Sequence, residues 1–228
     1  MNIGIIFAMQ IEMDAFLSVY DSYENKEHPL LNTHIIHTDQ HTIICALSGV
    51  GKVNAAMVTT LLIQNHPLDY LFNIGVAGGI HIPIETIVLA ENTLYSDVNV
   101  NAFGYPLGQL PGQSLTQEID RVLLEKTKTI LTTHNFKHHL GWIASGDQFV
   151  ISLEALKPVL DLYPKVCAVD MESASIMHVA NRLNVPALIM RSISDQVGAK
   201  AQSVDFNQFV KTASEKVALV LKETIASL

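Results

Sequence analysis

The chain has 228 residues, of which 49% are hydrophobic and only 16% are charged, a composition that favours one well-filled domain and excludes intrinsic disorder. Its formal net charge is −8, without any cluster of lysine or arginine, which excludes nucleic acid as an expected partner because the chain would repel phosphates. The sequence also lacks the basic amphipathic helix that anionic membranes attract, so we expect no membrane partner.

No part of the sequence resembles a targeting signal or a membrane span. Residues 1–9 fit a first core strand instead of a basic region followed by an apolar segment and a cleavage site. No apolar run approaches the roughly 20 residues that a membrane-spanning helix needs. Both cysteines, Cys45 and Cys167, lie in apolar runs, which predicts buried thiols without a disulfide. We therefore expect a cytoplasmic protein.

In the first half of the chain, short apolar runs alternate with helical patterns. The runs predict strands at residues 3–8, 33–38, 42–47, 69–76 and 86–90. The strand at 69–76 is expected to stop at Ala77-Gly78-Gly79. Apolar residues at helical spacing predict a first helix from Met9 to Tyr20. After a turn at residues 49–51, a second helix is predicted to contain Val53, Met57, Leu61 and Leu62.

The second half of the chain continues the alternation after a long loop. Residues 101–113 are rich in glycine, proline and aromatic residues and predict an ordered loop. Helices are predicted at residues 116–132, 152–162, 171–183 and from about 205 to the end. Strands are predicted to end near Ala144 and to span 165–169 and 186–193. We expect a single domain over residues 1–228, a three-layer αβα fold with a mixed, mostly parallel central sheet.

Polar and flexible residues gather where the predicted strands end. In folds of this class, ligands sit outside the carboxyl ends of the strands. The segments at those ends contain glycines, carboxylates and hydroxyls, whereas the strands themselves are apolar, and they span residues 9–12, 49–51, 77–79, 145–149, 170–172 and 194–195. This clustering predicts a ligand site along one edge of the sheet.

Charged residues in this set could carry acid–base chemistry, and each also has a structural explanation. Glu12 interrupts the apolar stripe of the first helix, and Glu172 begins the stripe of another, although a helix dipole also favours carboxylates there. Arg191 lies within an apolar strand and requires a partner, for which Glu12 and Glu172 are candidates. Asp195 follows that strand beside Ser194, where a turn residue is the alternative.

Several familiar cofactor and metal motifs are absent. Residues 49–52 (GVGK) lack the earlier glycine of a phosphate-binding loop, and no dinucleotide fingerprint follows the first strand. The ten histidines include no His-Glu-x-x-His motif, and no cysteine and histidine residues lie at zinc spacing. There is also no Gly-x-Ser-x-Gly nucleophile motif. We therefore expect neither a metal nor a cofactor.

Several segments along the whole chain share their order with one known family. They are IGIIFAM (3–9) with Glu12, SGVGKVNAA (48–56), NIGVAGG (73–79), AFGY (102–105) with QLPG (109–112), SGDQF (145–149), DMESA (170–174) and RSISD (191–195). With them the chain resembles the 5′-methylthioadenosine/S-adenosylhomocysteine nucleosidases of the nucleoside phosphorylase fold. The resemblance implies hydrolysis of the N-glycosidic bond of these two nucleosides, and also of 5′-deoxyadenosine, with release of adenine in methionine salvage and recycling of S-adenosylmethionine by-products.

The resemblance also implies a role for each charged residue. Asp195, supported by Ser194, would protonate N7 of adenine, and Glu12 would orient and deprotonate the attacking water. Glu172 would hold the ribose hydroxyls, and Arg191 would help to position the water and Glu172. These roles fit the chemistry, because glycosidic cleavage passes through an oxocarbenium-like transition state that carboxylates stabilise.

The remaining binding positions are implied in the same way. Phe149 would stack on the adenine, the backbone of Val150 would read its edge, and Met171 would pack on the sugar. Other positions implied to contact the substrate are Met9, Val50, Val76, Ala77, Gly78, Asp170 and Phe206. Residues that would reach into a partner subunit's site, and so imply a homodimer, are Val100, Phe103 and Pro111.

This chain departs from the family pattern at two positions, and other functions compete with the implied one. Val76 stands where the family often has a small hydroxyl residue, and Asp170 where it usually has glutamate. A purine nucleoside phosphorylase is disfavoured, because its phosphate pocket needs several arginines and Arg121 and Arg182 fall on predicted helix surfaces. A hydrolase of another 5′-modified purine nucleoside such as futalosine, and a nucleoside-binding sensor with weak activity, remain alternatives.

Overall fold

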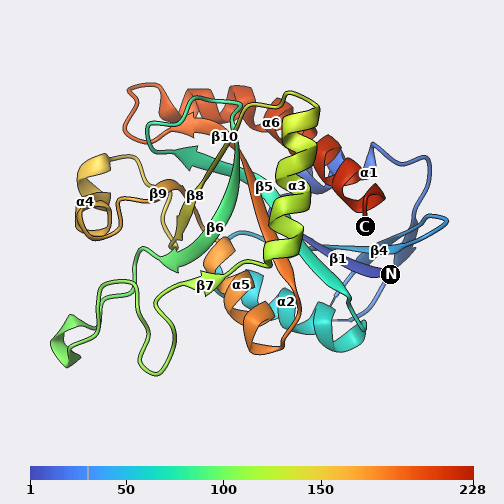
Figure 1. The fold of residues 1–228 in the computed structure, drawn as a ribbon, viewed down its shortest axis with the longest axis horizontal. Coiled ribbons are helices and arrows are strands. Elements are labelled where there is room, and N and C mark those ends of the chain that lie inside the picture. Colours follow the sequence, from blue (N-terminus) through green and yellow to red (C-terminus); the bar gives the residue numbers. More distant parts are fainter. Residues whose placement is uncertain (30) are drawn as a thin grey trace.

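A single mixed β-sheet forms the centre of the protein in the computed structural model, which describes residues 1–29 and 31–228 (Figure 1). Its strands are β1 (Asn2–Phe7), β2 (Glu24–Lys26), β3 (Thr33–His37), β4 (Thr42–Leu47), β5 (Tyr70–Gly79), β6 (Ile87–Tyr95), β7 (Gln117–Glu118), β8 (His138–Ser145), β9 (Val166–Asp170) and β10 (Ala187–Gln196). The strand order is β10-β6-β8-β9-β5-β1-β4-β3-β2, with β7 paired to β6. This confirms the predicted α/β fold with a mixed central sheet.

Part of the sheet closes on itself. β5 pairs with β10 as well as with β9, so β5, β10, β6, β8 and β9 form a closed ring of strands. The longest pairings, β10 with β5 and β6 with β8, are parallel, whereas β5 with β9 and β10 with β6 are antiparallel. The closure brings the ends of β5, β9 and β10 close together, although these strands are far apart in the sequence.

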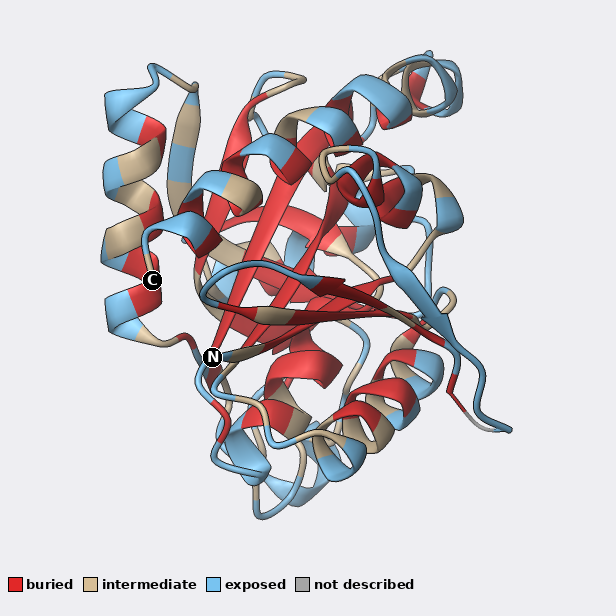
Figure 2. Ribbon diagram, turned by 90° about the vertical axis from the view of Figure 1, so that its right-hand side faces the viewer, coloured by how far each residue is buried: buried red, intermediate tan, exposed pale blue. Residues whose placement is uncertain are grey.

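Helices cover both faces of the sheet. They are α1 (Gln10–Leu17), α2 (Lys52–Asn65), α3 (Arg121–Thr133), α4 (Leu153–Leu162), α5 (Ser173–Arg182) and α6 (Gln202–Ala226), with a short 3₁₀ helix, η1, at Asn101–Phe103. α1 and α3 pack with α6 on one face, and α2 packs with α5 on the other (Figures 1 and 2). Among the helices described, none has the length and apolar character needed to cross a membrane.

The core lies between these helices and the sheet. Figure 2 shows the central strands buried almost throughout, while the outer surfaces of the helices are exposed. β1 contributes Ile3, Ile5 and Ile6, all fully buried, which explains why this strand has apolar side chains on both faces. Cys45 and Cys167 are buried free thiols, as predicted.

The strands that lead to the predicted site are longer than expected. β5 runs through Gly79 instead of stopping at Ala77, because its last residues pair with both β10 and β9. β10 runs to Gln196 instead of residue 193, because its last residues pair with the end of β5. Glycines end a strand only where no neighbouring strand forms hydrogen bonds with their backbone groups. Here the neighbouring strands do form these hydrogen bonds.

One other expectation about an element was wrong. Residues 117–118 form β7 instead of the start of a helix, and α3 begins only at Arg121. The reason is that Asp120 caps the helix, with its side chain accepting a hydrogen bond from the Leu123 backbone N–H at 2.8 Å. α2 contains Val53, Met57, Leu61 and Leu62 as expected, and on it Val53 and Met57 are 78% and 52% exposed and form an apolar outer face.

Candidate active site

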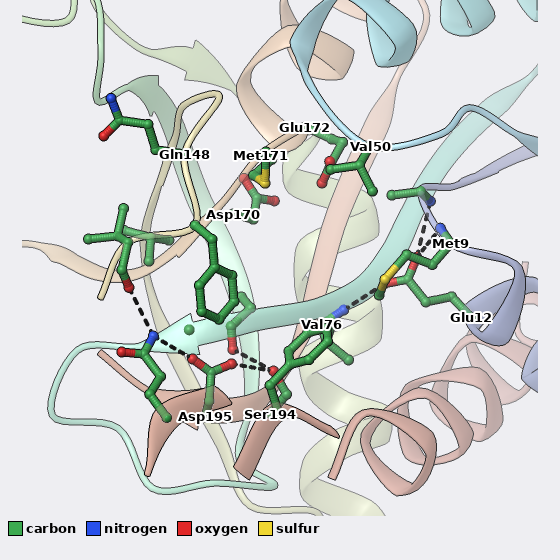
Figure 3. Close-up of a pocket in the computed structure, with 18 residues that line it drawn as sticks. Met9, Glu12, Val50, Val76, Gln148, Asp170, Met171, Glu172, Ser194 and Asp195 are labelled. Carbon is green, nitrogen blue, oxygen red and sulfur yellow. Dashed lines mark hydrogen bonds between the residues drawn. The ribbon is translucent and has the colours of Figure 1, made fainter. Parts of the chain in front are cut away.

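A cavity opens at the carboxyl ends of β1, β5, β9 and β10 (Figure 3). It is lined by Ala8, Met9, Glu12, Val50, Val76, Ala77, Gly78, Gln148, Phe149, Val150, Val169, Asp170, Met171, Glu172, Ser194, Asp195, Gln202 and Phe206. The strand-end segments selected from the sequence therefore meet at one place. Four selected residues are not part of this lining: Arg191 lies behind it, and Val100, Phe103 and Pro111 lie in the loop that follows β6.

Glu12 is held in the first turn of α1 by backbone groups from two segments. Its Oε2 accepts hydrogen bonds from the N–H groups of Ala8 and Met9 at 3.0 and 2.9 Å, and its Oε1 accepts one from Val76 at 3.0 Å. Burial raises the pKa of Glu12, while the nearby Arg191 charge and these N–H groups act in the opposite direction. The result is a fixed carboxyl group with an increased affinity for protons.

The backbone of β5 fits closely around this carboxyl group. A Cβ atom at Gly75 would collide with Oε1 of Glu12, so only glycine leaves room there. The next residue, Val76, donates to Glu12 through its backbone, and any residue other than proline would leave that donor in place. The Val76 side chain itself packs in a small apolar cluster with Met9 and Phe206. The departure from the family pattern at this position therefore leaves the hydrogen bond to Glu12 intact.

Arg191 is paired with Asp170 and not with either carboxylate proposed from the sequence. Its side chain is almost fully buried, and its Nε and Nη2 lie 2.9 and 2.8 Å from Oδ2 of Asp170. Nη2 also donates to the side-chain oxygen of Asn73, whose amide in turn donates to the backbone of Ile6. The prediction that Arg191 pairs with Glu12 or Glu172 was wrong, because Asp170 at the end of β9 is closer to the guanidinium.

The Asp170 carboxylate accepts further hydrogen bonds besides those from Arg191. The hydroxyl groups of Ser145 and Ser173 both donate to this carboxylate. Ser145 also accepts a hydrogen bond from the backbone N–H of Ala174 at 2.9 Å, which ties the end of β8 to the first turn of α5. Asp170 therefore serves as the hub of a buried network, which explains why the shorter aspartate is sufficient at this position.

Glu172 precedes the first residue of α5 and points into the cavity (Figure 3). Its Oε1 accepts a hydrogen bond from the backbone N–H of Gly51 at 2.8 Å, so the turn before α2 fixes its orientation. Burial and the neighbouring Asp170 charge raise the pKa of Glu172 to about 7, although Arg191 acts in the opposite direction. Near neutral pH this carboxyl group can therefore exist in both protonation states.

Ser194 and Asp195 both face the cavity although they are neighbours on one strand. Successive side chains of a regular strand point to opposite faces. Here the pairing of β10 with β5 shifts between Ile193 and Asp195, and this bulge brings both residues to the same side. The Ser194 hydroxyl donates to Oδ1 of Asp195 at 2.6 Å. Oδ2 accepts a hydrogen bond from the side-chain amide of Gln202 at 2.8 Å.

Aromatic residues form the wall beside Asp195. Phe149 and Phe206 meet edge to face, with ring centroids 5.8 Å apart and an interplanar angle of 80°. Phe149 remains half exposed and lines the cavity, so part of its ring is accessible to a ligand. The carbonyl of Val150 accepts a hydrogen bond from Gln202 at 2.9 Å, which links this wall to the start of α6.

Some residues of the site could not be identified from the sequence. Gln202 lies before the expected start of the last helix and belongs to no periodic pattern, so nothing marked it. Asn73 gave a usable signal, since a polar residue within the apolar run of a buried strand needs an internal partner. Gly75 gave none, because a glycine in a strand has many explanations.

We expect Asp170 to stabilise the fold because it pairs with the buried Arg191. Asp170→Ala should lower the free energy of unfolding by about 3–5 kcal/mol, because it leaves Arg191 buried without a partner. The double change Asp170→Leu with Arg191→Met removes both charges and should recover most of that loss. Urea unfolding monitored by circular dichroism gives the comparison, and a loss below about 1 kcal/mol for Asp170→Ala would contradict this account.

The raised pKa of Glu172 should make stability depend on pH. A carboxyl group with an ordinary pKa of 4.5 when unfolded and about 7 when folded stabilises the protein below pH 4.5, and this contribution is lost as the pH rises through 7. Relative to Glu172→Gln, the wild type should lose up to about 3 kcal/mol of unfolding free energy between pH 4.5 and 8. Urea unfolding at both pH values measures it, and a pH-independent difference would refute it.

The whole chain is similar to proteins of known family. It matches the phosphorylase superfamily over residues 2–226. The 5′-methylthioadenosine/S-adenosylhomocysteine nucleosidase of Oceanobacillus iheyensis is 34% identical over 223 residues, covering 97% of each chain. The nucleosidase of the same name from Neisseria meningitidis, solved with methylthio-immucillin-A, has a TM-score of 0.94 at 30% identity, covering 100% of this chain and 99% of that one.

A second enzyme type has the same fold. The futalosine hydrolase of Helicobacter pylori also superposes with a TM-score of 0.94 at 30% identity, covering 100% of this chain and 98% of that one. Full-length coverage at this identity confirms the predicted fold and the resemblance drawn from the sequence motifs. The chain therefore belongs to the phosphorylase superfamily and, within it, to the family of the 5′-methylthioadenosine/S-adenosylhomocysteine nucleosidases.

Proposed function

We propose that this enzyme hydrolyses the N-glycosidic bond of 5′-methylthioadenosine and S-adenosylhomocysteine, and also of 5′-deoxyadenosine, and releases adenine. The observation that carries the proposal is the set of buried carboxyl groups around one cavity. Asp195 lies on one side of it, Glu12 on another and Glu172 on a third (Figure 3). One acid, one base and one group for the sugar are what hydrolysis at an anomeric carbon requires.

In this mechanism, Asp195 acts on the leaving base. It donates a proton to N7 of adenine while the bond between N9 and the anomeric carbon breaks, and the bonding electron pair stays with the base. Protonation makes adenine a better leaving group and leaves an oxocarbenium-like sugar. The hydrogen bond from Ser194 to Oδ1 keeps the carboxyl group in one orientation. Phe149 stacks on the adenine ring, and the backbone of Val150 contacts its edge.

Glu12 acts on the water. It accepts a proton from the water while the water oxygen bonds to the anomeric carbon, which yields the free sugar. Burial raises the pKa of Glu12 and so makes it a better base than an exposed glutamate. Glu172 binds the ribose hydroxyls, with Met171 against the sugar. Arg191 acts through Asp170, since it contacts neither the cavity nor Glu172 directly, and its charge favours the ionised forms of Glu12 and Glu172.

Phosphorolysis is the weaker candidate for this cavity. A phosphate co-substrate needs cationic partners, and no lysine or arginine is present among the residues that line the cavity. Arg191 is paired with Asp170 and does not line the cavity. Futalosine hydrolysis is the stronger alternative, because the Helicobacter pylori futalosine hydrolase has the same degree of structural similarity as the nucleosidases.

We further propose that the enzyme is a cytoplasmic homodimer that works in methionine salvage and in recycling of S-adenosylmethionine by-products. The free thiols Cys45 and Cys167 fit a reducing compartment. For the dimer, the support is apolar surface: Phe103 is 79% exposed, and Val53 and Met57 form the exposed outer face of α2. In this arrangement Val100, Phe103 and Pro111 of each subunit extend toward the cavity of the other.

Adenine release with and without phosphate tests the reaction. We expect 5′-methylthioadenosine to be cleaved at the same rate in both, and Asp195→Asn to lower kcat by about 10²–10⁴-fold because asparagine cannot supply the acidic proton. Asp161→Asn, at an exposed position on α4, serves as the control. Strict phosphate dependence or full activity of Asp195→Asn would overturn the proposal. A higher kcat/KM for futalosine than for 5′-methylthioadenosine would reassign the substrate.

The dimer is tested at Phe103. Sedimentation should give twice the 25.0 kDa chain mass for the wild type. Phe103→Ser should increase the monomer fraction and raise KM for 5′-methylthioadenosine, because it removes both apolar contact and part of the proposed binding wall. Val122→Ser, an exposed apolar position on α3, should change neither. A wild type that stays monomeric with full activity contradicts this arrangement.

A further inference from the structure

The side chain of Gln202 occupies a position that the proposed mechanism does not explain. Gln202 is the first residue of α6 and is only 5% exposed. Its amide nitrogen Nε2 donates to the carbonyl of Val150 at 2.9 Å and to Oδ2 of Asp195 at 2.8 Å. Its amide oxygen accepts a hydrogen bond from the backbone N–H of Gly198 at 3.0 Å. One –NH₂ group therefore bridges two acceptors on the wall of the cavity.

The same two acceptors suit the amino group of adenine. In adenine the 6-amino group lies beside N7 on one edge of the ring, and like a carboxamide it has two N–H donors. The proposed function places Asp195 opposite N7 and the Val150 backbone at this edge. An amino group on that edge would need Oδ2 of Asp195 and the Val150 carbonyl, which are the acceptors that Gln202 already uses. Two –NH₂ groups cannot occupy one bridging position.

Asp195 gives a second reason for Gln202 to move. Its Oδ1 accepts from Ser194 and its Oδ2 accepts from Gln202, so both oxygens accept hydrogen bonds from side chains. With both oxygens already accepting hydrogen bonds, neither is free to face N7 of a bound base. If Gln202 moves away, Oδ2 becomes free for the base.

We propose that Gln202 is an intramolecular competitor of the purine base, a positioning residue whose amide imitates the 6-amino group and is displaced when the base binds. This inference rests on the proposed function, in which Asp195 and Val150 contact adenine. Gln202 keeps the two acceptors hydrogen-bonded, and base binding exchanges its donors for those of adenine. The apparent affinity for the base is then reduced by the fraction of molecules in which Gln202 occupies the bridging position.

The competition predicts that removing the amide strengthens binding. Gln202→Met keeps a similar length and volume but has no donor. Calorimetric titration should show adenine binding about 5–10-fold tighter than to the wild type, as expected for loss of one or two competing hydrogen bonds. Hypoxanthine, which has an oxygen in place of the amino group, should bind more weakly than adenine to both proteins and gain by the same factor. KM for 5′-methylthioadenosine should fall as well.

A purely structural role for Gln202 predicts the opposite sign. If its amide only ties α6 to the wall, Gln202→Met should weaken adenine binding and raise KM, and that result overturns the inference. Gln208→Met, at an exposed position of the same helix, is the matched control and should bind adenine like the wild type. Circular dichroism confirms that each variant is folded.

A crystal structure of the wild type with adenine keeps the inference testable if Gln202→Met fails to fold. We expect the Gln202 amide beyond hydrogen-bond distance of Asp195 and the adenine amino group between Asp195 and Val150. Adenine bound with the Gln202 bridge intact refutes the competition. A wild type that neither binds adenine nor cleaves 5′-methylthioadenosine refutes the proposed function itself, whereas cleavage together with weaker binding by Gln202→Met refutes only the competition.

Discussion

Arg191 is held inside the sheet by Asp170 and Asn73, and the arrangement of the whole cavity depends on this buried ion pair. A guanidinium without water needs a carboxylate and further acceptors, because an unpaired buried charge destabilises a fold by about 3–5 kcal/mol. Satisfying it requires the end of β9 to lie beside the middle of β5 and β10, since one residue comes from each strand. Closure of the sheet and burial of the Arg191 cation therefore depend on each other, and the cavity lies beside the buried ion pair.

The ion pair also determines how the other carboxyl groups behave. Asp170 is the carboxylate in direct contact with the cation, whereas Glu12 and Glu172 experience Arg191 only at longer range. Burial then dominates for these two groups, and both have a raised pKa. The buried carboxyl groups around Arg191 therefore differ in how directly they contact the cation.

The edge of the sheet where the cavity lies could be predicted from the sequence, since buried strands are visible as apolar runs and their polar ends, such as Glu12 and Asp195, stand out against them. The partner of Arg191 could not be predicted, because Glu12, Glu172 and Asp170 all follow strands and only the order of strands in space selects among them. Gln202 could not be found either, as its role arises from a contact with Val150, 52 residues away. At Val76 the sequence suggests a difference that the structure does not have. This residue contributes to Glu12 through its backbone, and that contribution does not depend on the side chain.

The bulge in β10 has a consequence for how such a site can change in evolution. It adds one residue to β10 relative to β5 just before Asp195, and so a hydroxyl and a carboxyl group share one face of the strand. Without this register shift, regular alternation would place the two neighbouring side chains on opposite faces, and only one of them could face the cavity. In this segment, insertions and deletions should therefore disturb the site more than most substitutions do. The number of residues at the end of β10 matters to the site together with their identity.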